Sequence, residues 1–338
     1  MDELQAVNGL QTIATWWMWA GFGLFVIAML ALDLLMLGRK GAHKVGASEA
    51  LTWSLIWFAM ALLFGAGLWF WLDHSAGREL ANSRTMEYLT GYLLEKTLAM
   101  DNIFVFVMIF GYFAVPLQFQ KRVLVYGVLG AIILRALMIG IGAWLISQFH
   151  WVLYIFGAFL LITGIKMLIF ADHEPNLGKN SILKWLKNQM RVTDEYHGDK
   201  FWVNINGVRW FTPMFLVLIL IELSDVIFAM DSIPAIFAIT SDPFIVFTSN
   251  IFAILGLRAL YFLLADMADR FHLLKYGLAV VLMFVGVKML IVEWYKIPVA
   301  LSLAVVAGLL ATSIFLSIIS TCKQKSDALT SKTRHSLL

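Results

Sequence analysis

Charge and cysteine are both scarce in this sequence of 338 residues. Only 14% of the residues are charged, 61% are hydrophobic, and the mean hydropathy is +0.83. Soluble globular domains carry about 25% charged residues, so the composition excludes that class and indicates an integral membrane protein. The one cysteine, Cys322, excludes an intrachain disulfide and a metal site built from several thiolates.

The sequence also lacks the motifs of common enzymes and nucleotide-binding proteins. It contains no Walker sequence, no glycine-rich dinucleotide loop and no Ser/His/Asp arrangement. We therefore expect no enzymatic activity and no prosthetic group, and the expected partner is the lipid bilayer, with no nucleic acid. All seven histidines fall in predicted loops or at predicted membrane interfaces, so no imidazole is expected at membrane depth.

Long apolar runs predict about nine transmembrane helices. A hydrocarbon core of about 30 Å needs roughly 20 helical residues. The runs that meet this length are 16–37, 50–72, 87–113, 122–146, 151–170, 212–240, 244–265, 274–292 and 297–320. Lys and Arg concentrate in alternate loops, which predicts an N-terminus outside and a C-terminus in the cytoplasm.

One acidic motif occurs twice in the chain. The segments are Glu95-Lys-Thr-Leu-Ala-Met-Asp101-Asn-Ile103 and Asp225-Val-Ile-Phe-Ala-Met-Asp231-Ser-Ile233. Each copy begins a unit of three predicted spans, and because three is odd the second unit enters the membrane from the opposite side. The sequence therefore predicts an inverted 3+3 internal repeat, an architecture of alternating-access transporters.

The repeat divides the chain into six predicted segments. These are an N-terminal two-helix segment (1–86), repeat A (87–170), a cytoplasmic loop with an amphipathic helix (171–211), inverted repeat B (212–292), a last helix (293–320) and a disordered cytoplasmic tail (321–338). Within the loop, 180–190 is expected to form a helix on the membrane surface, and 201–210 carries an Asn-Gly turn signal for a small hairpin.

Five carboxylates are predicted to lie at or near membrane depth. Because a charged side chain at the bilayer centre costs a few kcal/mol, the default interpretation is an ion or proton pathway. Without imidazole or thiolate the site is oxygen-rich, which favours a hard divalent cation such as Mn(II), Ca(II) or Mg(II). The predicted metal ligands are Glu95, Asp101, Glu222, Asp225 and Asp231, with Asn102, Ser232, Met100 and Met230 as possible neighbours of the ion.

Helix geometry sets a condition on this site. Residues six apart on a straight α-helix point about 240° apart, so Glu95 and Asp101 cannot face one ion from an unbroken helix. We therefore expect both acidic spans to be broken. Pro234 supplies a cause in the second span, because it lacks a backbone donor, whereas only Asn102 disrupts the first.

Three cations fall in the same parts of the predicted spans as the acids. Arg135, Arg258 and Lys96 are predicted to compensate the carboxylate charge while no metal is bound. The alternative is a buried ion-pair network that fixes helix packing. Five acids against three cations leave a surplus of negative charge, which a divalent cation or protons would fill.

Three stretches of the sequence resemble a known family. Glu95–Phe106, Arg122–Gly130 and Glu222–Phe237 closely resemble the TerC family, in particular its Alx-type members, and the likeness covers about residues 18 to 320. The resemblance implies a bacterial inner-membrane protein of the LysE-type transporter superfamily and manganese export, with the five acids matching the family's acidic positions. TerC relatives were named for tellurite resistance, and some are tied to metal loading of exported proteins.

The sequence thus predicts a secondary transporter that exports Mn(II) from cytoplasm to periplasm, with protons as the exchanged ion. Two alternatives remain open at this point: a LysE-type amino-acid exporter, and a non-transporting membrane factor that loads metal into exported proteins. The oligomeric state is not determined by the sequence.

Overall fold

A computed structural model describes residues 6–7, 10–40, 47–149, 151–169, 185, 189–264, 274–295 and 297–335, and confirms an all-α polytopic membrane protein. The side chains of 6–7, 10–11, 33–40, 47, 100, 101, 104, 274, 275, 318 and 320–335 are not described. The helices are α1 (Trp16–Lys40), α2 (Ala47–Ser75), α3 (Arg78–Tyr112), α4 (Leu117–Gln148), α5 (Val152–Ile169), α7 (Pro213–Phe237), α8 (Pro243–Leu255), α9 (Leu257–Leu264), α10 (Leu274–Leu290) and α11 (Val299–His335). Two short hairpins complete the fold: β1 (Ala6–Val7) with β2 (Leu10–Gln11), and β3 (Trp202–Ile205) with β4 (Val208–Phe211).

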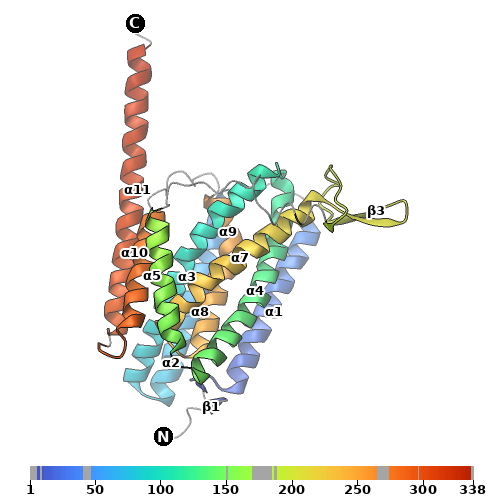
Figure 1. Cartoon of the computed structure of the whole chain (residues 1–338). Coiled ribbons are helices and arrows are strands. Elements are labelled where there is room, and N and C mark those ends of the chain that lie inside the picture. The colour runs from blue at the N-terminus through green and yellow to red at the C-terminus, as the bar shows by residue number, and fades with distance from the viewer. Residues whose placement is uncertain are drawn as a thin grey trace.

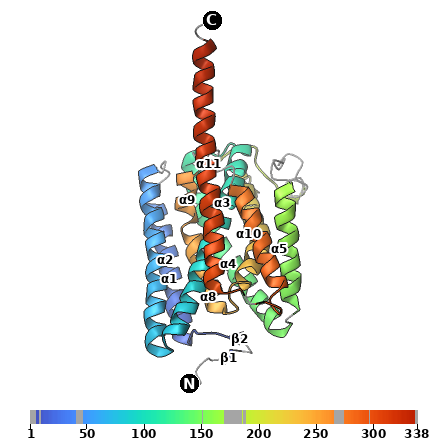
Figure 2. The same ribbon diagram turned by 90° about the vertical axis from the view of Figure 1, so that its left-hand side faces the viewer.

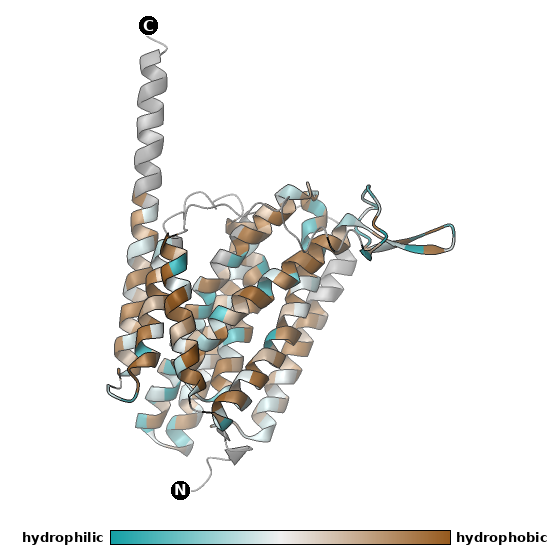
Figure 3. Cartoon of the chain, viewed as in Figure 1, coloured by the Kyte–Doolittle hydropathy of each residue, from teal (hydrophilic) through white to brown (hydrophobic). Residues whose placement is uncertain are grey.

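Several of the described helices can cross a bilayer. Five of them are long and apolar enough by length and composition, or six if the bent pair α8 and α9 forms one span. Two shorter apolar stretches lie in α1 and α10. Each predicted apolar run coincides with a described helix or with the bent pair, while the total of nine spans stays a prediction. Apolar residues cover much of the helix surface in Figure 3, as lipid contact requires.

The predicted breaks at the acidic motifs are wrong. Helix α3 runs unbroken through Glu95 and Asn102, and α7 runs unbroken through Asp225 and Asp231. The Asn102 side chain bonds to another helix instead of its own backbone, with its amide donating to Asp225 (3.3 Å). Pro234 lies in the last turn of α7, where the helix ends at Phe237, so the lost backbone donor disturbs little of the helix.

The described break in the helical bundle lies between α8 and α9. The two helices meet at Gly256 with a bend of 40°. A Cβ at Gly256 would lie 2.5 Å from the Lys96 Nζ and 3.3 Å from the Trp57 Cβ, so α3 and α2 press directly on the bend. A side chain larger than glycine at this position would therefore displace the Lys96 ammonium.

The C-terminal region also differs from the prediction. A disordered tail is expected over 321–338, but the backbone of α11 stays helical to His335 and extends beyond the bundle (Figure 2). The segment contains no proline or glycine after Gly308, so nothing in it stops the helix. The predicted surface helix over 180–190 lies mostly outside the described residues.

Helices from the two predicted repeats pack across one another. Helix α3 contacts α8 and α4 contacts α7, while α5 lies along α10 (Figure 1). A two-fold axis between the repeats would exchange the first two pairs and map the third onto itself. The contacts agree with an inverted repeat, which itself stays a prediction.

Glycines bring α5 and α10 into backbone contact. A Cβ at Gly164 would lie 2.7 Å from the Ala279 carbonyl oxygen, and one at Gly286 would lie 2.8 Å from the Gly157 carbonyl oxygen. Any larger side chain would force the two backbones apart, so this pair forms a close-packed unit at one side of the bundle.

Candidate functional site

Arg135 of α4 lies at the centre of a buried charged cluster. Its side chain is 1% exposed and forms an ion pair with Glu95 of α3. Its Nη2 and Nε donate to the two carboxylate oxygens of Asp225 on α7, at 2.8 and 3.1 Å. Since Glu95 is 0% and Asp225 2% exposed, one guanidinium holds two fully buried carboxylates from different predicted repeats.

Two amides complete the surroundings of Arg135. Asn102 donates to Asp225 (3.3 Å), and the Oδ1 of Asn250 on α8 accepts from Arg135 Nη1 (3.2 Å). The second polar atom of each amide, Asn102 Oδ1 and Asn250 Nδ2, is buried and has no hydrogen-bond partner in the described part of the chain. Buried polar atoms are normally paired, so the cluster retains unused donor and acceptor capacity.

A small cavity lies beside this cluster. It has a volume of about 50 Å³, and its polar lining consists of Asn102, Arg135, Asp231 and Ser232. One water requires roughly 10–15 Å³, so the cavity has room for a small hydrated guest. Among the described residues the Ser232 hydroxyl has no hydrogen-bond partner, and Asp231 lies beside Thr163 of α5.

The remaining predicted ligands lie apart from this cavity or outside the description. Glu222 packs against α4, where a Cβ at Gly130 would overlap its carboxylate. The side chain of Asp101, like that of Met100, lies outside the described residues. Among the described side chains, no group of three His, Cys, Asp or Glu residues is arranged to hold a metal ion. The five-acid metal site therefore stays a prediction.

The structure changes the roles expected of two residues near the acids. Met230 is 51% exposed, because it lies one residue before Asp231 and about 100° around the helix; it faces away from the cavity. The Lys96 ammonium reaches the Ala253 carbonyl oxygen at 3.5 Å and so lies at the C-terminal end of α8, where a cation complements the helix dipole. Arg258 lies directly after the bend and is half-buried.

Sequence reasoning missed Asn250, the amide that supports Arg135. It lies in a run of polar residues, Thr248, Ser249 and Asn250, all 0% exposed. Apart from Arg258, the rest of this predicted span contains no charged or amide side chain. Three consecutive polar residues at membrane depth were the available signal for a buried polar partner.

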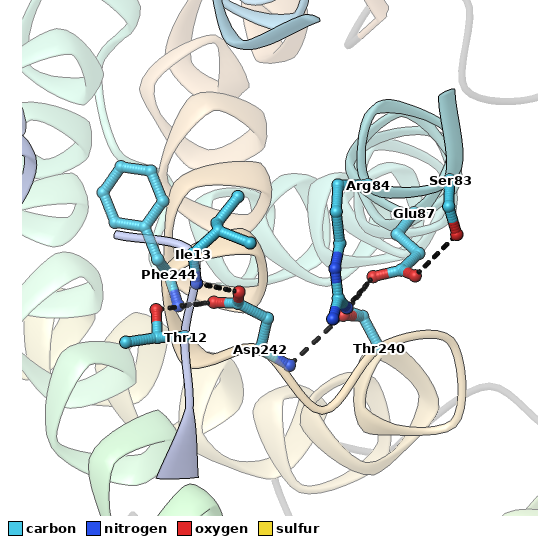
Figure 4. A network of polar contacts seen from close by, with 8 residues as sticks. All are labelled: Thr12, Ile13, Ser83, Arg84, Glu87, Thr240, Asp242 and Phe244. Atoms are coloured by element: carbon cyan, nitrogen blue, oxygen red, sulfur yellow. Dashed lines mark hydrogen bonds and ion pairs between the residues drawn. The ribbon is translucent and has the colours of Figure 1, made fainter. Parts of the chain in front are cut away.

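A second polar network was also missed, at the end of the bundle that carries the N-terminus (Figure 4). Asp242, the N-cap of α8, accepts hydrogen bonds from the Thr12 hydroxyl (2.9 Å), the Ile13 amide (2.7 Å) and the Phe244 amide (2.9 Å). Thr240 donates to Glu87 of α3 (2.6 Å) and accepts from the Asp242 amide (3.2 Å). The Asp242-Pro243 pair is a helix-start signal, but its bond to the N-terminal segment depends on tertiary structure.

Comparison with known proteins gives consistent results. The family described as "Integral membrane protein TerC family" matches residues 80–326. A Shigella flexneri protein named "Putative membrane-bound redox modulator Alx" is 56% identical over 308 residues, 91% of this chain and 96% of the relative. Uncharacterized membrane proteins of Myxococcus xanthus and Rickettsia bellii are 48% and 42% identical, over 89% of this chain and 92% and 97% of their own lengths.

No solved structure matches the chain. The family match covers most of the sequence, and its relatives are aligned over nearly their full length. The chain therefore belongs to the TerC family of integral membrane proteins.

Proposed function

We propose that this protein is a secondary transporter that exports Mn(II) from the cytoplasm to the periplasm across the bacterial inner membrane. The observation that carries the proposal is the buried Glu95–Arg135–Asp225 cluster, which lies beside a small cavity lined by polar and apolar side chains. Two carboxylates share one guanidinium there, so the ionised cluster has an excess of negative charge. A divalent cation or protons would neutralise that excess.

The guanidinium and the metal compete for the same oxygen atoms in this mechanism. In the described conformation Arg135 binds Asp225 through two nitrogens, an arrangement that satisfies the carboxylate without a metal. A Mn(II) ion entering the cavity from the Asp231 side would draw on oxygens of Asp231, Asn102 and Ser232, and Asp225 would become a ligand once Arg135 withdraws. Mn(II) is favoured by carboxylate and carbonyl oxygen ligands.

Energy must be supplied for this direction of transport. The membrane potential opposes export of a cation by about 2.3 kcal/mol per charge per 100 mV. Protons moving inward through the same carboxylates offset that cost, because the membrane potential favours their entry by the same amount per charge. Each acid that takes up a proton also releases its hold on the metal. We therefore propose proton exchange as the driving reaction.

The name of the relatives, a redox modulator, fits this proposal only indirectly. A dithiol–disulfide reaction within one chain needs two cysteines, and this sequence has one, Cys322. We assign any redox effect of this protein to the metal it moves, since manganese is a redox-active ion.

Transport into inverted membrane vesicles tests the proposal. We expect radioactive manganese uptake by the wild type and a loss of about tenfold or more in Asp225→Asn and Asp231→Asn, because each 1.4 kcal/mol of lost binding changes an equilibrium tenfold. Asp73→Asn is the matched control, since Asp73 pairs with Arg78 at the α2–α3 turn, away from the cavity.

The outcomes separate the three functions named for the sequence. Equal manganese uptake by wild type, Asp225→Asn and Asp231→Asn would refute the mechanism. Uptake of lysine in place of manganese identifies an amino-acid exporter. Absence of flux in purified, reconstituted protein, together with co-purification of the secretion machinery, identifies a metal-loading factor.

A further inference from the structure

The β3–β4 hairpin leaves the helical bundle sideways (Figure 1). Its strands pair antiparallel from Trp202↔Phe211 to Ile205↔Val208. The connecting Asn206 and Gly207 have φ values of 53° and 78°, as a tight two-residue turn requires. The predicted hairpin is thus confirmed, and its tip lies beyond the side of the bundle.

The root of the hairpin is held firmly by the bundle. Arg122 of α4 pairs with Asp199 and lies 5.6 Å over the ring of Phe201. Phe211 stacks on Phe215 of α7 at 4.6 Å. Phe201 is 6% exposed. Because aromatic and charged contacts fix the root on two helices, the direction in which the hairpin projects is fixed as well.

The hairpin carries apolar side chains that the described bundle does not cover. Trp202, which pairs with Phe211 at the root, is 51% exposed, and Ile205 and Val208, beside the turn, are 38% and 37% exposed. Arg209 places its guanidinium 5.7 Å from the centre of the Trp202 ring. Tryptophan paired with a basic residue is typical of the boundary between lipid and water.

A hollow lies against the same hairpin. Its volume is about 550 Å³, and its polar lining includes His197, Lys200 and Asn204 beside the Trp202 ring. Lys200 and Asn204 are exposed, so their donors are available to an anion. A lysine ammonium and an amide donor are suited to a phosphate group.

We propose that the β3–β4 hairpin docks on the cytoplasmic surface of the bilayer, with its tip among the lipid headgroups and an anionic phospholipid headgroup in the hollow beside Lys200. The hairpin projects sideways next to the first turn of α7 (Figure 1), the predicted start of a span, where headgroups surround the protein. Ile205 and Val208 beside the turn are apolar and partly exposed, and the exposed Lys200 and Arg209 complement an anionic leaflet. Docking would hold the N-terminal end of α7 at a fixed depth in the membrane. The same helix carries Asp225 and Asp231 further along.

The single native cysteine makes the docking directly measurable. In a Cys322→Ser background, Val208→Cys accepts one spin label at the tip of the hairpin. Leu63→Cys, 70% exposed on α2, provides the lipid reference, and Ser75→Cys at the exposed α2–α3 turn provides the water reference. Full-length protein is reconstituted in nanodiscs of phosphatidylcholine with or without phosphatidylglycerol.

We expect the label at position 208 to collide with lipid-soluble oxygen more than with a water-soluble nickel complex, and more so with phosphatidylglycerol present. In anionic nanodiscs, Lys200→Gln should lower the ratio of docked to undocked hairpin about fivefold. This factor corresponds to the roughly 1 kcal/mol that one basic residue near an anionic surface contributes. Lys200→Arg should preserve it.

Two results would overturn the proposal. Nickel accessibility equal to that of the Ser75 position would place the hairpin in water. Spin–spin broadening that grows with protein density would place the tip against a second copy of the chain. Ile205→Cys, measured in the same way, guards against a local effect of the label.

Discussion

Arg135 illustrates how one side chain organises the membrane interior. It is 1% exposed and satisfies Asp225 with two nitrogens while contacting Glu95 and Asn250. Removing one member of a buried charged network leaves the others uncompensated, at a cost of about 3–5 kcal/mol. The arginine therefore holds α3, α4, α7 and α8 together, and in the proposed transport cycle it must be replaced by another cation when it moves.

The position of the Glu222 carboxylate depends on a glycine in the neighbouring helix. Its carboxylate packs against Gly130 of α4, so Gly130→Ala would push it out of place. The end of a glutamate side chain can move, so we expect the protein to fold. Because Glu222 is one of the five predicted metal ligands, manganese uptake in inverted vesicles should fall severalfold. The expectation depends on the proposed transport function.

Gly140→Ala is the control for this substitution. Gly140 lies on the same helix, and none of the described atoms would lie within 4 Å of the added Cβ. Alanine is favoured over glycine in a helix interior by about 1 kcal/mol, so its melting temperature should stay the same or rise with transport unchanged. Wild-type transport by Gly130→Ala would show that Glu222 has no positional role.

At the scale of elements, rigid and bent parts of the fold occur side by side. Helices α5 and α10 approach backbone to backbone at Gly157, Gly164 and Gly286, which leaves little freedom for sliding. The pair α8 and α9 bends at Gly256, where Lys96 reaches the Ala253 carbonyl. Displacement within the α5–α10 pair would bring backbone against backbone, whereas the closest neighbour of the α8–α9 bend is the end of a flexible lysine side chain.

The segment before α1 is fastened to the start of α8 by Asp242. Asp242→Ala removes an N-cap worth about 0.5–2 kcal/mol and frees the Thr12 hydroxyl and the Ile13 amide. We expect faster amide hydrogen exchange at residues 12–15 and a lower melting temperature. Asp242→Asn keeps a capping side chain and should exchange more slowly than Asp242→Ala; equal exchange in wild type and Asp242→Ala would contradict the prediction.

The same residue predicts a dependence on pH. Asp242 lies between two predicted spans, and burial raises its pKa above the ordinary 3.8, although the bonds from Ile13, Thr12 and Phe244 partly counteract this. A raised pKa in the folded state means that the protonated form contributes stability below 3.8, and that this contribution is lost as the pH rises through the raised value. Thermal unfolding should show this decrease toward neutral pH in the wild type and not in Asp242→Asn.

At the scale of the whole molecule, the proposed export direction depends on which side of the membrane each end of the chain occupies. The basic loops predict a cytoplasmic C-terminus, and α11 leads out of the bundle toward it (Figure 2). Cys322 should therefore react with a membrane-permeant maleimide in intact spheroplasts but not with an impermeant one. In the double variant Cys322→Ser and Ser75→Cys, the impermeant reagent should react. The reverse labelling pattern would show that the chain has the opposite orientation in the membrane.

Local sequence was sufficient for much of this protein. The apolar runs predicted where helices lie, because each run must bury or face lipid along its own length. The doubled motif located Glu95, Asp225 and Asp231, and the Asn206-Gly207 pair predicted the hairpin. The break predicted at Pro234 was wrong, because the effect of a proline depends on its distance from the end of the helix. The sequence did not define the end of α7.

The sequence by itself determined the membrane class, the positions of the helices and the presence of Glu95, Arg135 and Asp225 within them, because hydropathy acts residue by residue along the chain. Only the tertiary structure decided which charges meet. Glu95 and Lys96 are neighbours in sequence, yet one faces Arg135 and the other Ala253, since adjacent residues on a helix point about 100° apart. Packing of α3 between α7 and α8 set those partners, and no local pattern records that packing.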